Sequence, residues 1–330
     1  MNADDPYRLL PSCEEYDVPQ LISQARLAEQ AGFECLWISD HFHPWTDAQG
    51  NSPLVWSMIG AISQVTSLPI ATAVTCPTVR IHPAIVAQAA ATSALLTEGK
   101  FVLGVGSGEA LNEHITGARW PSTDTRLDML EEAIEVMRAL WTGEFVDHHG
   151  PHYTVENARL YSLPATPPPV YVSGFGPKSA ALAGRIGDGF VSTTPDAEAI
   201  KTFREHGGAG KPMQAGYKVC WSKDKARAVS TAHTVWPNEE LPGELAQQLS
   251  SPRHFEQAGQ LVTEEMVEQS TVCGDDVTAH VEAFRPFLDA GFDDIHISQI
   301  GADRAGTEAE GFFEFYANSV LPRLRDLAPK

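Results

Sequence analysis

A short segment of the chain concentrates side chains that could carry out chemistry. An apolar run, CLWI (35–38), is followed directly by SDHFHPW (39–45). Asp40 is an acid, His41 carries an imidazole that can accept or donate a proton, and Trp45 offers a broad aromatic surface. Such groups could move a proton to or from a substrate held against an aromatic wall. Asp40 could equally cap a turn, and the aromatic rings could pack a loop, so the meaning depends on the elements that position them.

A second polar segment also follows a strand-like run. FVLGVG (101–106) continues into SGEALNE (107–113), which contains Glu109 and Asn112. The glycines are not the dinucleotide-binding pattern G-x-G-x-x-G, because Glu109 occupies the sixth position. A carboxyl group at this place could exchange a proton with a bound molecule.

His41 and His43 form an H-x-H pair that could bind a metal ion. A metal-dependent barrel hydrolase would need further ligands at later strand ends, and the fifth predicted strand ends in Ser173. We therefore predict no metal site.

Strand-like and helix-like segments alternate along the whole chain. The strands are predicted at 6–10, 35–39, 68–74, 101–106, 169–173, 189–193, 215–221 and 294–299. The main helices are predicted at 18–32, 53–65, 83–96, 126–141, 178–187, 277–291 and 311–325. Alternation of this kind implies a parallel sheet, and eight units favour a closed (β/α)₈ TIM barrel of the α/β class over an open doubly wound sheet.

Two insertions interrupt the alternation within one predicted domain, 1–330. The first, at about 143–168, begins with a predicted hairpin and ends in a proline-rich stretch. The second, at 222–270, is mainly helical. Barrels carry functional insertions on their C-terminal face, so we expect both near that face.

Charge and composition exclude several classes of function. Asp and Glu number 43 against 23 Lys and Arg, for a formal net charge of −20, so nucleic acid and anionic membranes would be repelled. No stretch reaches the roughly 20 apolar residues that span a bilayer, and the N-terminal residues lack a secretory pattern. The 5 scattered cysteines suit a reducing compartment. We expect a cytoplasmic enzyme that acts on a small molecule.

The strand-end motifs together resemble a known family. SDHFHPW, TCP (75–77), GVGSGEALNE (104–113), GPK (176–178) and GDGF (187–190) occur in this order. They are similar to motifs of the luciferase-like monooxygenase superfamily, in its branch that uses coenzyme F420, an 8-hydroxy-5-deazaflavin. The resemblance runs from Tyr7 to Leu324. It implies a dehydrogenase that transfers a hydride from a CH–OH group of a sugar or secondary alcohol, as the family's glucose-6-phosphate and alcohol dehydrogenases do, and it implies a homodimer.

The resemblance also implies which residues hold the coenzyme. Ala73 and Val74 match a non-proline cis peptide that presses on the ring, and Cys76 stands where threonine is common in the family. The turn at 175–179 matches the coenzyme's phosphate site. The full implied set is Asp40, Ala73, Val74, Cys76, Ser107, Asn112, Phe175, Gly176, Lys178 and Ser179.

The implied catalytic residues are His41, Glu109 and Trp45. Oxidising an alcohol by hydride transfer requires one group for the hydroxyl proton and another near the ring, and the family pattern supports His41 and Glu109 without saying which proton each handles. Trp45 would wall the pocket.

On the substrate side, the resemblance implies Thr193, Asp196 and Gln257. The last two stand where sugar-phosphate enzymes of the family carry cations, and an acid would repel phosphate. An uncharged substrate is therefore favoured, although Lys218, Arg253 or His254 could replace the cations.

Three alternatives remain open. One is an FMN-dependent luciferase-like monooxygenase on the same fold, against which Glu109 argues. The others are the metal-dependent hydrolase and a barrel that only binds a ligand.

Overall fold

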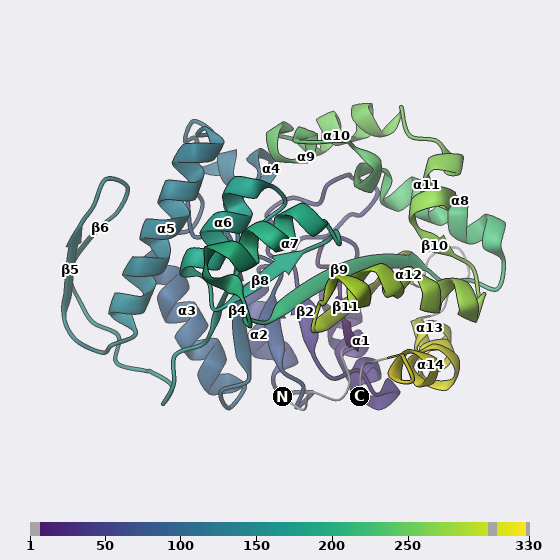
Figure 1. The fold of residues 1–330 in the computed structure, drawn as a ribbon, viewed down its shortest axis with the longest axis horizontal. Coiled ribbons are helices and arrows are strands. Elements are labelled where there is room, and N and C mark those ends of the chain that lie inside the picture. Colours follow the sequence, from purple (N-terminus) through teal and green to yellow (C-terminus); the bar gives the residue numbers. More distant parts are fainter. Residues whose placement is uncertain (1–6, 303–308, 328–330) are drawn as a thin grey trace.

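The computed structural model describes residues 7–302 and 309–327, and within them eight parallel strands close into a barrel (Figure 1). The strands pair in chain order, and the pairing of β11 with β1 completes the circle. They are β1 (Tyr7–Leu9), β2 (Leu36–Ile38), β3 (Ile70–Thr72), β4 (Phe101–Val105), β7 (Val170–Ser173), β8 (Gly189–Ser192), β9 (Met213–Cys220) and β11 (Asp294–Gln299). A short strand, β10 (Val272–Cys273), adds to β9 outside the circle. The predicted (β/α)₈ barrel is confirmed.

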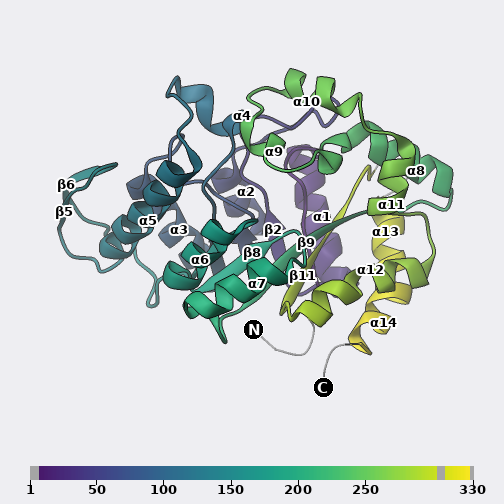
Figure 2. The same ribbon diagram turned by 45° about the horizontal axis from the view of Figure 1, so that its top comes forward.

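Helices follow the strands and form the outer layer, as Figures 1 and 2 show. They include α1 (Val18–Ala31), α2 (Val55–Ile62), α3 (Pro83–Leu96), α5 (Thr123–Leu140), α6 (Pro177–Ile186), α7 (Ala197–Phe203) and α12 (Val277–Ala290). The boundaries of α1 have local causes. Asp17 caps its first turn by accepting a hydrogen bond from the Gln20 N–H, and Gly32 ends it with a left-handed φ of 87°.

The last predicted helix, 311–325, is divided in the structure. It consists of α13 (Ala309–Phe315), a wider π-helical turn η4 (Tyr316–Val320) and α14 (Leu321–Arg325). Pro322 lies in the first turn of α14, where its missing N–H costs no helical hydrogen bond.

Inward-facing side chains fill the barrel interior below its C-terminal opening, which we call the mouth. Trp37 stacks on His296 with ring centroids 3.9 Å apart, and its Nε1 donates to Gln214 Oε1 at 3.0 Å. Nearer the strand N-termini, Arg8 Nη2 lies 2.8 Å from Asp294 Oδ1. The interior is therefore filled, and the C-terminal mouth is the part left for a ligand.

The first insertion is the predicted hairpin, made of β5 (Val146–His149) and β6 (Thr154–Ala158). Its strands lie beside α5 at the side of the barrel (Figure 1, left). Glu132 of α5 accepts from the backbone N–H groups of His152 and Tyr153. The Tyr153 hydroxyl lies 3.1 Å from the carbonyl oxygens of Pro77 and Thr78, so the turn of the hairpin supports the loop that follows β3.

The second insertion lies over the C-terminal ends of the strands (Figures 1 and 2). It contains α8 (Lys225–Val235), the 3₁₀ turn η3 (Pro237–Glu240), α9 (Leu245–Gln248), α10 (Pro252–Gly259) and α11 (Glu264–Ser270). Its predicted helical character is confirmed. Within the described residues, no helix is long and apolar enough to cross a membrane.

Candidate active site

The loops after β2 and β4 meet at the barrel mouth through one buried side chain, Asn112. Its Oδ1 accepts from the backbone N–H groups of Phe42 (2.7 Å) and His43 (2.9 Å), and its Nδ2 donates to Glu109 Oε1 at 2.5 Å. His43 Nδ1 also lies 3.0 Å from the Leu111 carbonyl oxygen. The two motifs are therefore one unit, and the predicted coenzyme ligand Asn112 is already engaged with protein at both ends of its amide.

His41 is paired with a carboxylate that the sequence did not single out. Its Nε2 lies 3.4 Å from Oε1 of Glu14, which follows β1 and is buried. The other carboxylate oxygen accepts from the hydroxyls of Ser12 (2.6 Å) and Ser39 (2.8 Å). Burial alone would raise the pKa of Glu14, but the charge of His41 and the two hydroxyls outweigh burial and lower it. Glu14 therefore stays ionised and holds the imidazole in place.

The second nitrogen of this imidazole lacks a partner in the part of the chain that the structure describes. His41 Nδ1 is buried and makes no hydrogen bond to the described residues. A buried polar atom without a partner is unfavourable, so a ligand hydroxyl that bonded to it would relieve that cost.

Trp45 forms a wall between His41 and the second insertion. Its ring centroid lies 5.0 Å from that of His41 and 5.1 Å from that of Phe255 in α10, the latter edge-on. The insertion thus contacts the ring that packs beside the histidine.

A buried network of ion pairs and hydrogen bonds holds the Asp40 carboxylate in place. Arg80 Nη2 lies 2.9 Å from Asp40 Oδ1, and the Thr75 hydroxyl donates to Asp40 Oδ2 at 2.8 Å. Arg80 Nε also lies 3.4 Å from Glu113 Oε1. The sequence analysis gave Arg80 no role, because that role depends on bringing together acids from the ends of two different strands.

Glu113 is buried in this network and has a raised pKa although it accepts backbone hydrogen bonds. Its Oε2 accepts from the backbone N–H groups of Val79 (3.2 Å) and Arg80 (2.7 Å). Burial nevertheless raises the pKa of Glu113 to about 7, and the neighbouring charge of Glu109 acts in the same direction. The same acids, after burial itself, raise the pKa of the Cys76 thiol well above its ordinary value, so Cys76 is a neutral and weak hydrogen-bond donor at the mouth.

The peptide bond between Ala73 and Val74 is cis, as predicted. Glycines in β4 and directly after it leave room for the backbone and side chains around this bond. A Cβ atom on Gly106 would lie 2.8 Å from Val74 Cγ2, and one on Gly104 would lie 2.0 Å from the Thr72 carbonyl oxygen. Ser107 follows directly and is half-buried.

The predicted phosphate site lies at the N-terminus of α6. Gly176 caps the helix with extended backbone, and a Cβ atom there would meet nothing within 4 Å. The Gly176 N–H donates to Ser179 Oγ at 3.2 Å. Lys178 is exposed, with its Nζ 2.5 Å from Asp124 Oδ1, and Phe175 is half exposed. An open helix N-terminus beside a lysine suits an anionic group.

The three predicted substrate residues are exposed. Thr193 follows β8. Asp196 caps α7, because its Oδ1 accepts from the N–H groups of Glu198 (2.8 Å) and Ala199 (3.2 Å). Gln257 lies on α10. Asp196 therefore has a structural role that accounts for an acid at this position. In the described residues, no cluster of three or more potential metal ligands is found.

Comparison with known proteins places the chain in a family. Residues 9–294 match the family model described as luciferase-like monooxygenase. The chain belongs to this family. Its relatives include the F420-dependent glucose-6-phosphate dehydrogenase of Beutenbergia cavernae, 34% identical over 95% of this chain and 96% of the relative. The enzyme of the same name from Kribbella flavida is 34% identical over 96% of this chain and 97% of the relative.

Two solved structures are similar to the chain. An F420-dependent secondary alcohol dehydrogenase in complex with an F420–acetone adduct matches with a TM-score of 0.87 and 30% identity, over 98% of this chain and 100% of that chain. The F420-dependent tetrahydromethanopterin reductase of Methanopyrus kandleri shares the fold, with a TM-score of 0.77 and 19% identity over 97% of this chain and 99% of that chain. The family predicted from the strand-end motifs is confirmed.

Proposed function

We propose that this protein is an F420-dependent dehydrogenase that oxidises the CH–OH group of a small, uncharged hydroxyl compound. The observation that carries the proposal is the Glu14–His41 pair at the same barrel mouth as Glu109 and Trp45. In this pair, the imidazole Nδ1 has no hydrogen-bond partner among the described residues. The similar dehydrogenases and their F420 dependence support it.

The residues at the mouth fit the coenzyme. When bound, the deazaflavin supplies the hydride acceptor. The cis peptide at Ala73–Val74 and the neighbouring glycines offer a surface of small groups, while the α6 N-terminus at 176–179 offers backbone N–H groups and Lys178 to a phosphate. We assign Asp40, Cys76, Ser107 and Asn112 to the polar edge of the same site.

His41 is the proposed base for the substrate hydroxyl. Its Nδ1 would accept the hydroxyl proton as the hydride leaves the carbon. The resulting imidazolium would carry a positive charge next to the Glu14 carboxylate, which stabilises it and keeps the proton on Nε2. Trp45 would hold the substrate carbon against this histidine and keep water away.

Glu109 is the proposed proton-exchanging group on the coenzyme side. Asn112 donates to its Oε1 and thereby orients the carboxylate at the start of α4 (Ala110–Glu113). The second oxygen remains available for a proton that enters or leaves the ring.

An uncharged substrate fits the proposed substrate edge best. Asp196 is an exposed acid and Gln257 is neutral, so neither offers the charge-assisted hydrogen bond that holds a phosphate in proteins. We assign Thr193, Asp196 and Gln257 to this edge.

We also propose that the enzyme works as a cytoplasmic homodimer. Several apolar side chains at the N-cap of α2 and on α3 are exposed, namely Leu54 (55%), Ile85 (58%), Leu95 (45%) and Leu96 (41%). Such a surface suits a second copy of the chain. Light scattering of the purified protein during gel filtration tests this point: a monomer would contradict it.

Coenzyme titration followed by substrate screening tests the proposed function. Tryptophan fluorescence should be quenched by F420 at lower concentration than by FMN. Sugars, sugar phosphates and secondary alcohols are then screened for loss of the visible absorbance of oxidised F420. Tighter binding of FMN, or no reduction of F420 by any hydroxyl compound, would contradict the proposal.

A further inference from the structure

One lysine on β9 faces the barrel mouth. On this strand, Gln214 bonds to Trp37 inside the barrel, and a Cβ atom on Gly216 would lie 2.9 Å from the same ring. Because side chains alternate along a strand, Lys218 faces the same interior one layer nearer the C-terminal end. It lies opposite Ser298 of β11, and its side chain is 17% exposed.

Lys218 contacts two residues of the second insertion. Its Nζ lies 2.9 Å from Glu239 Oε1 in η3 and 4.3 Å from the ring centroid of Trp236. The Trp236 indole N–H in turn donates to Glu15 Oε2 at 2.8 Å, beside the residue that pairs with His41. Trp45 packs against the same apolar cluster as Trp236. The ammonium group is thus connected through Trp236 and Glu15 to the loop that carries Glu14, the partner of His41.

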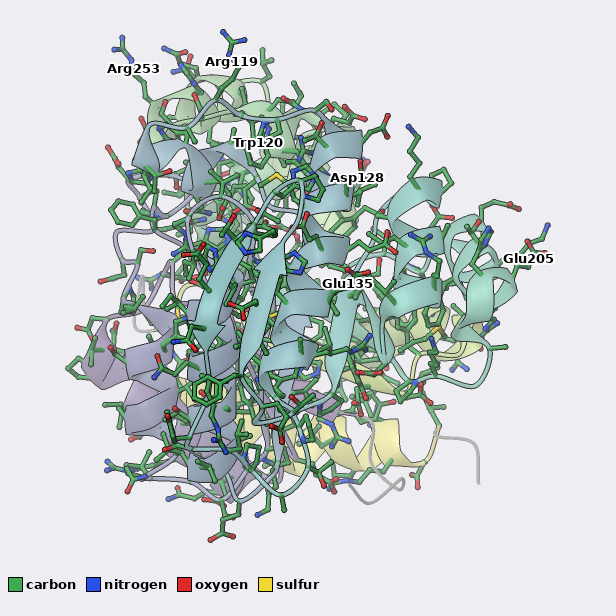
Figure 3. The ribbon with its side chains drawn as sticks, turned by 90° about the vertical axis from the view of Figure 1, so that its left-hand side faces the viewer. Arg119, Trp120, Asp128, Glu135, Glu205 and Arg253 are labelled. Carbon is green, nitrogen blue, oxygen red and sulfur yellow. The ribbon has the colours of Figure 1, made fainter. Side chains whose placement is uncertain are left out.

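The other two candidate cations are placed differently. Arg253 and His254 are exposed on α10, and Figure 3 shows Arg253 projecting away from the protein. Of the three basic residues that could replace the missing phosphate ligands, Lys218 is the one that faces the mouth.

We propose that Lys218 binds the substrate and that Glu239 makes this site selective for uncharged hydroxyl compounds. The inference rests on the proposed function and deepens it. Glu239 accepts one of the three N–H donors of Lys218, which leaves donors for a hydroxyl oxygen. A phosphate at the same place would meet the Glu239 carboxylate at close range and be repelled. Paired with Glu239, Lys218 therefore acts as a hydrogen-bond donor with little net charge.

Removing the negative charge should convert this site into an anion site. We expect Glu239→Gln to lower the KM for glucose 6-phosphate by about tenfold, the usual size of one hydrogen bond to a charged group. The KM for glucose should change by less than about threefold, because a neutral substrate does not sense the charge. Lys218→Met should raise the KM for glucose, and it should abolish the gain for glucose 6-phosphate in the double variant.

Glu240→Gln is the matched control. It removes the same charge from the next residue, whose side chain accepts a hydrogen bond from the Ser270 hydroxyl instead of facing Lys218. This variant should leave the ratio of the two KM values unchanged. If Glu239→Gln behaves like Glu240→Gln, the selectivity role of the pair is wrong.

Calorimetry separates a failure of this inference from a failure of the proposed function. Binding of glucose 6-phosphate and of glucose is measured on each variant without turnover. A wild-type protein that reduces F420 while Glu239→Gln binds glucose 6-phosphate no tighter would overturn the inference alone. Tighter binding of glucose 6-phosphate by Glu239→Gln, in a protein that never reduces F420, would support the selective site and overturn the proposed dehydrogenase.

Discussion

The imidazole of His41 lies 3.4 Å from the buried carboxylate of Glu14, an acid from the loop that follows a different strand. Ser12 and Ser39 both donate to the far oxygen of Glu14 and lock its orientation. This carboxylate–histidine pair is the part of the site whose chemistry can be tested most directly.

We expect His41→Ala to lower kcat by about 10²–10⁴-fold, as loss of a general base usually does. The dissociation constant of F420, measured by tryptophan quenching, should change far less, because His41 is assigned to the substrate. Wild-type turnover in this variant would rule out His41 as the base.

Glu14→Gln should lower kcat while the imidazole remains in place, because a neutral amide stabilises the imidazolium less than a carboxylate does. The dissociation constant of F420 should stay close to the wild-type value, because Glu14 contacts His41 and not the proposed coenzyme site. A wild-type kcat in this variant would mean that Glu14 only packs the loop.

The variants Glu109→Gln and Asn112→Ala should distinguish the catalytic role of Glu109 from the structural role of Asn112. Glu109→Gln keeps an acceptor for the Asn112 amide, so we expect a loss in kcat of about 10²-fold or more with little change in thermal stability. Asn112→Ala leaves the N–H groups of Phe42 and His43 without their acceptor, which should cost about 1–3 kcal/mol of stability. Thermal unfolding and steady-state kinetics on both variants decide between the roles.

Arg80→Met should destabilise the protein by about 3–5 kcal/mol, because it leaves Asp40 and Glu113 buried without their cation. Adding Glu113→Gln should restore part of that loss by removing one of the two uncompensated acids. Arg285→Met, which breaks an exposed helical pair with Glu282, is the control and should have little effect. Equal midpoints of urea unfolding for the Arg80 and Arg285 variants would contradict the network.

His296 should make stability depend on pH. Burial lowers the pKa of His296 well below its ordinary value of 6.5, and the positive charge of Arg8 acts in the same direction. The folded state therefore binds fewer protons than the unfolded state, so the stability from neutral His296 is fully present above pH 6.5 and is lost as the pH falls. His296→Phe keeps a ring on Trp37 and should lose less stability between pH 7 and pH 5 than wild type.

The exposed His149→Gln is the control for this prediction. Its unfolding free energy should follow the wild-type pH dependence. His280, a second buried histidine with a lowered pKa, should leave some dependence in every variant.

Gln257→Lys should lower the KM for glucose 6-phosphate by about tenfold or more if α10 borders the substrate, because it restores a cation at the predicted edge. It is a cleaner test than changing Asp196, which would also remove the cap of α7. Gln260→Lys, on an exposed residue at the end of the same helix, provides the matched control. Equal KM values for the two lysine variants would remove Gln257 from the site.

Local patterns determined the barrel and the location of its chemistry. The alternation of apolar strands and amphipathic helices can be recognised from patterns among residues close in the sequence. A parallel barrel then brings the carboxyl end of every strand to one face. The motifs at 39–45 and 107–113 were therefore predictable as neighbours, and Asn112 joins them. The cis bond at Ala73–Val74 was predictable only through the family resemblance.

Side-chain partnerships were decided by the tertiary structure. Glu14 is one of two successive acids after β1, and only closure of the barrel brings it to His41. Arg80 joins acids that follow two different strands, and Lys218 is coupled to Glu239 from the insertion. Such contacts depend on the direction of side chains in the closed barrel and on the path of long insertions. The local periodicity of the sequence does not predict these side-chain directions or the path of the insertions, because both result from packing between segments far apart in the chain.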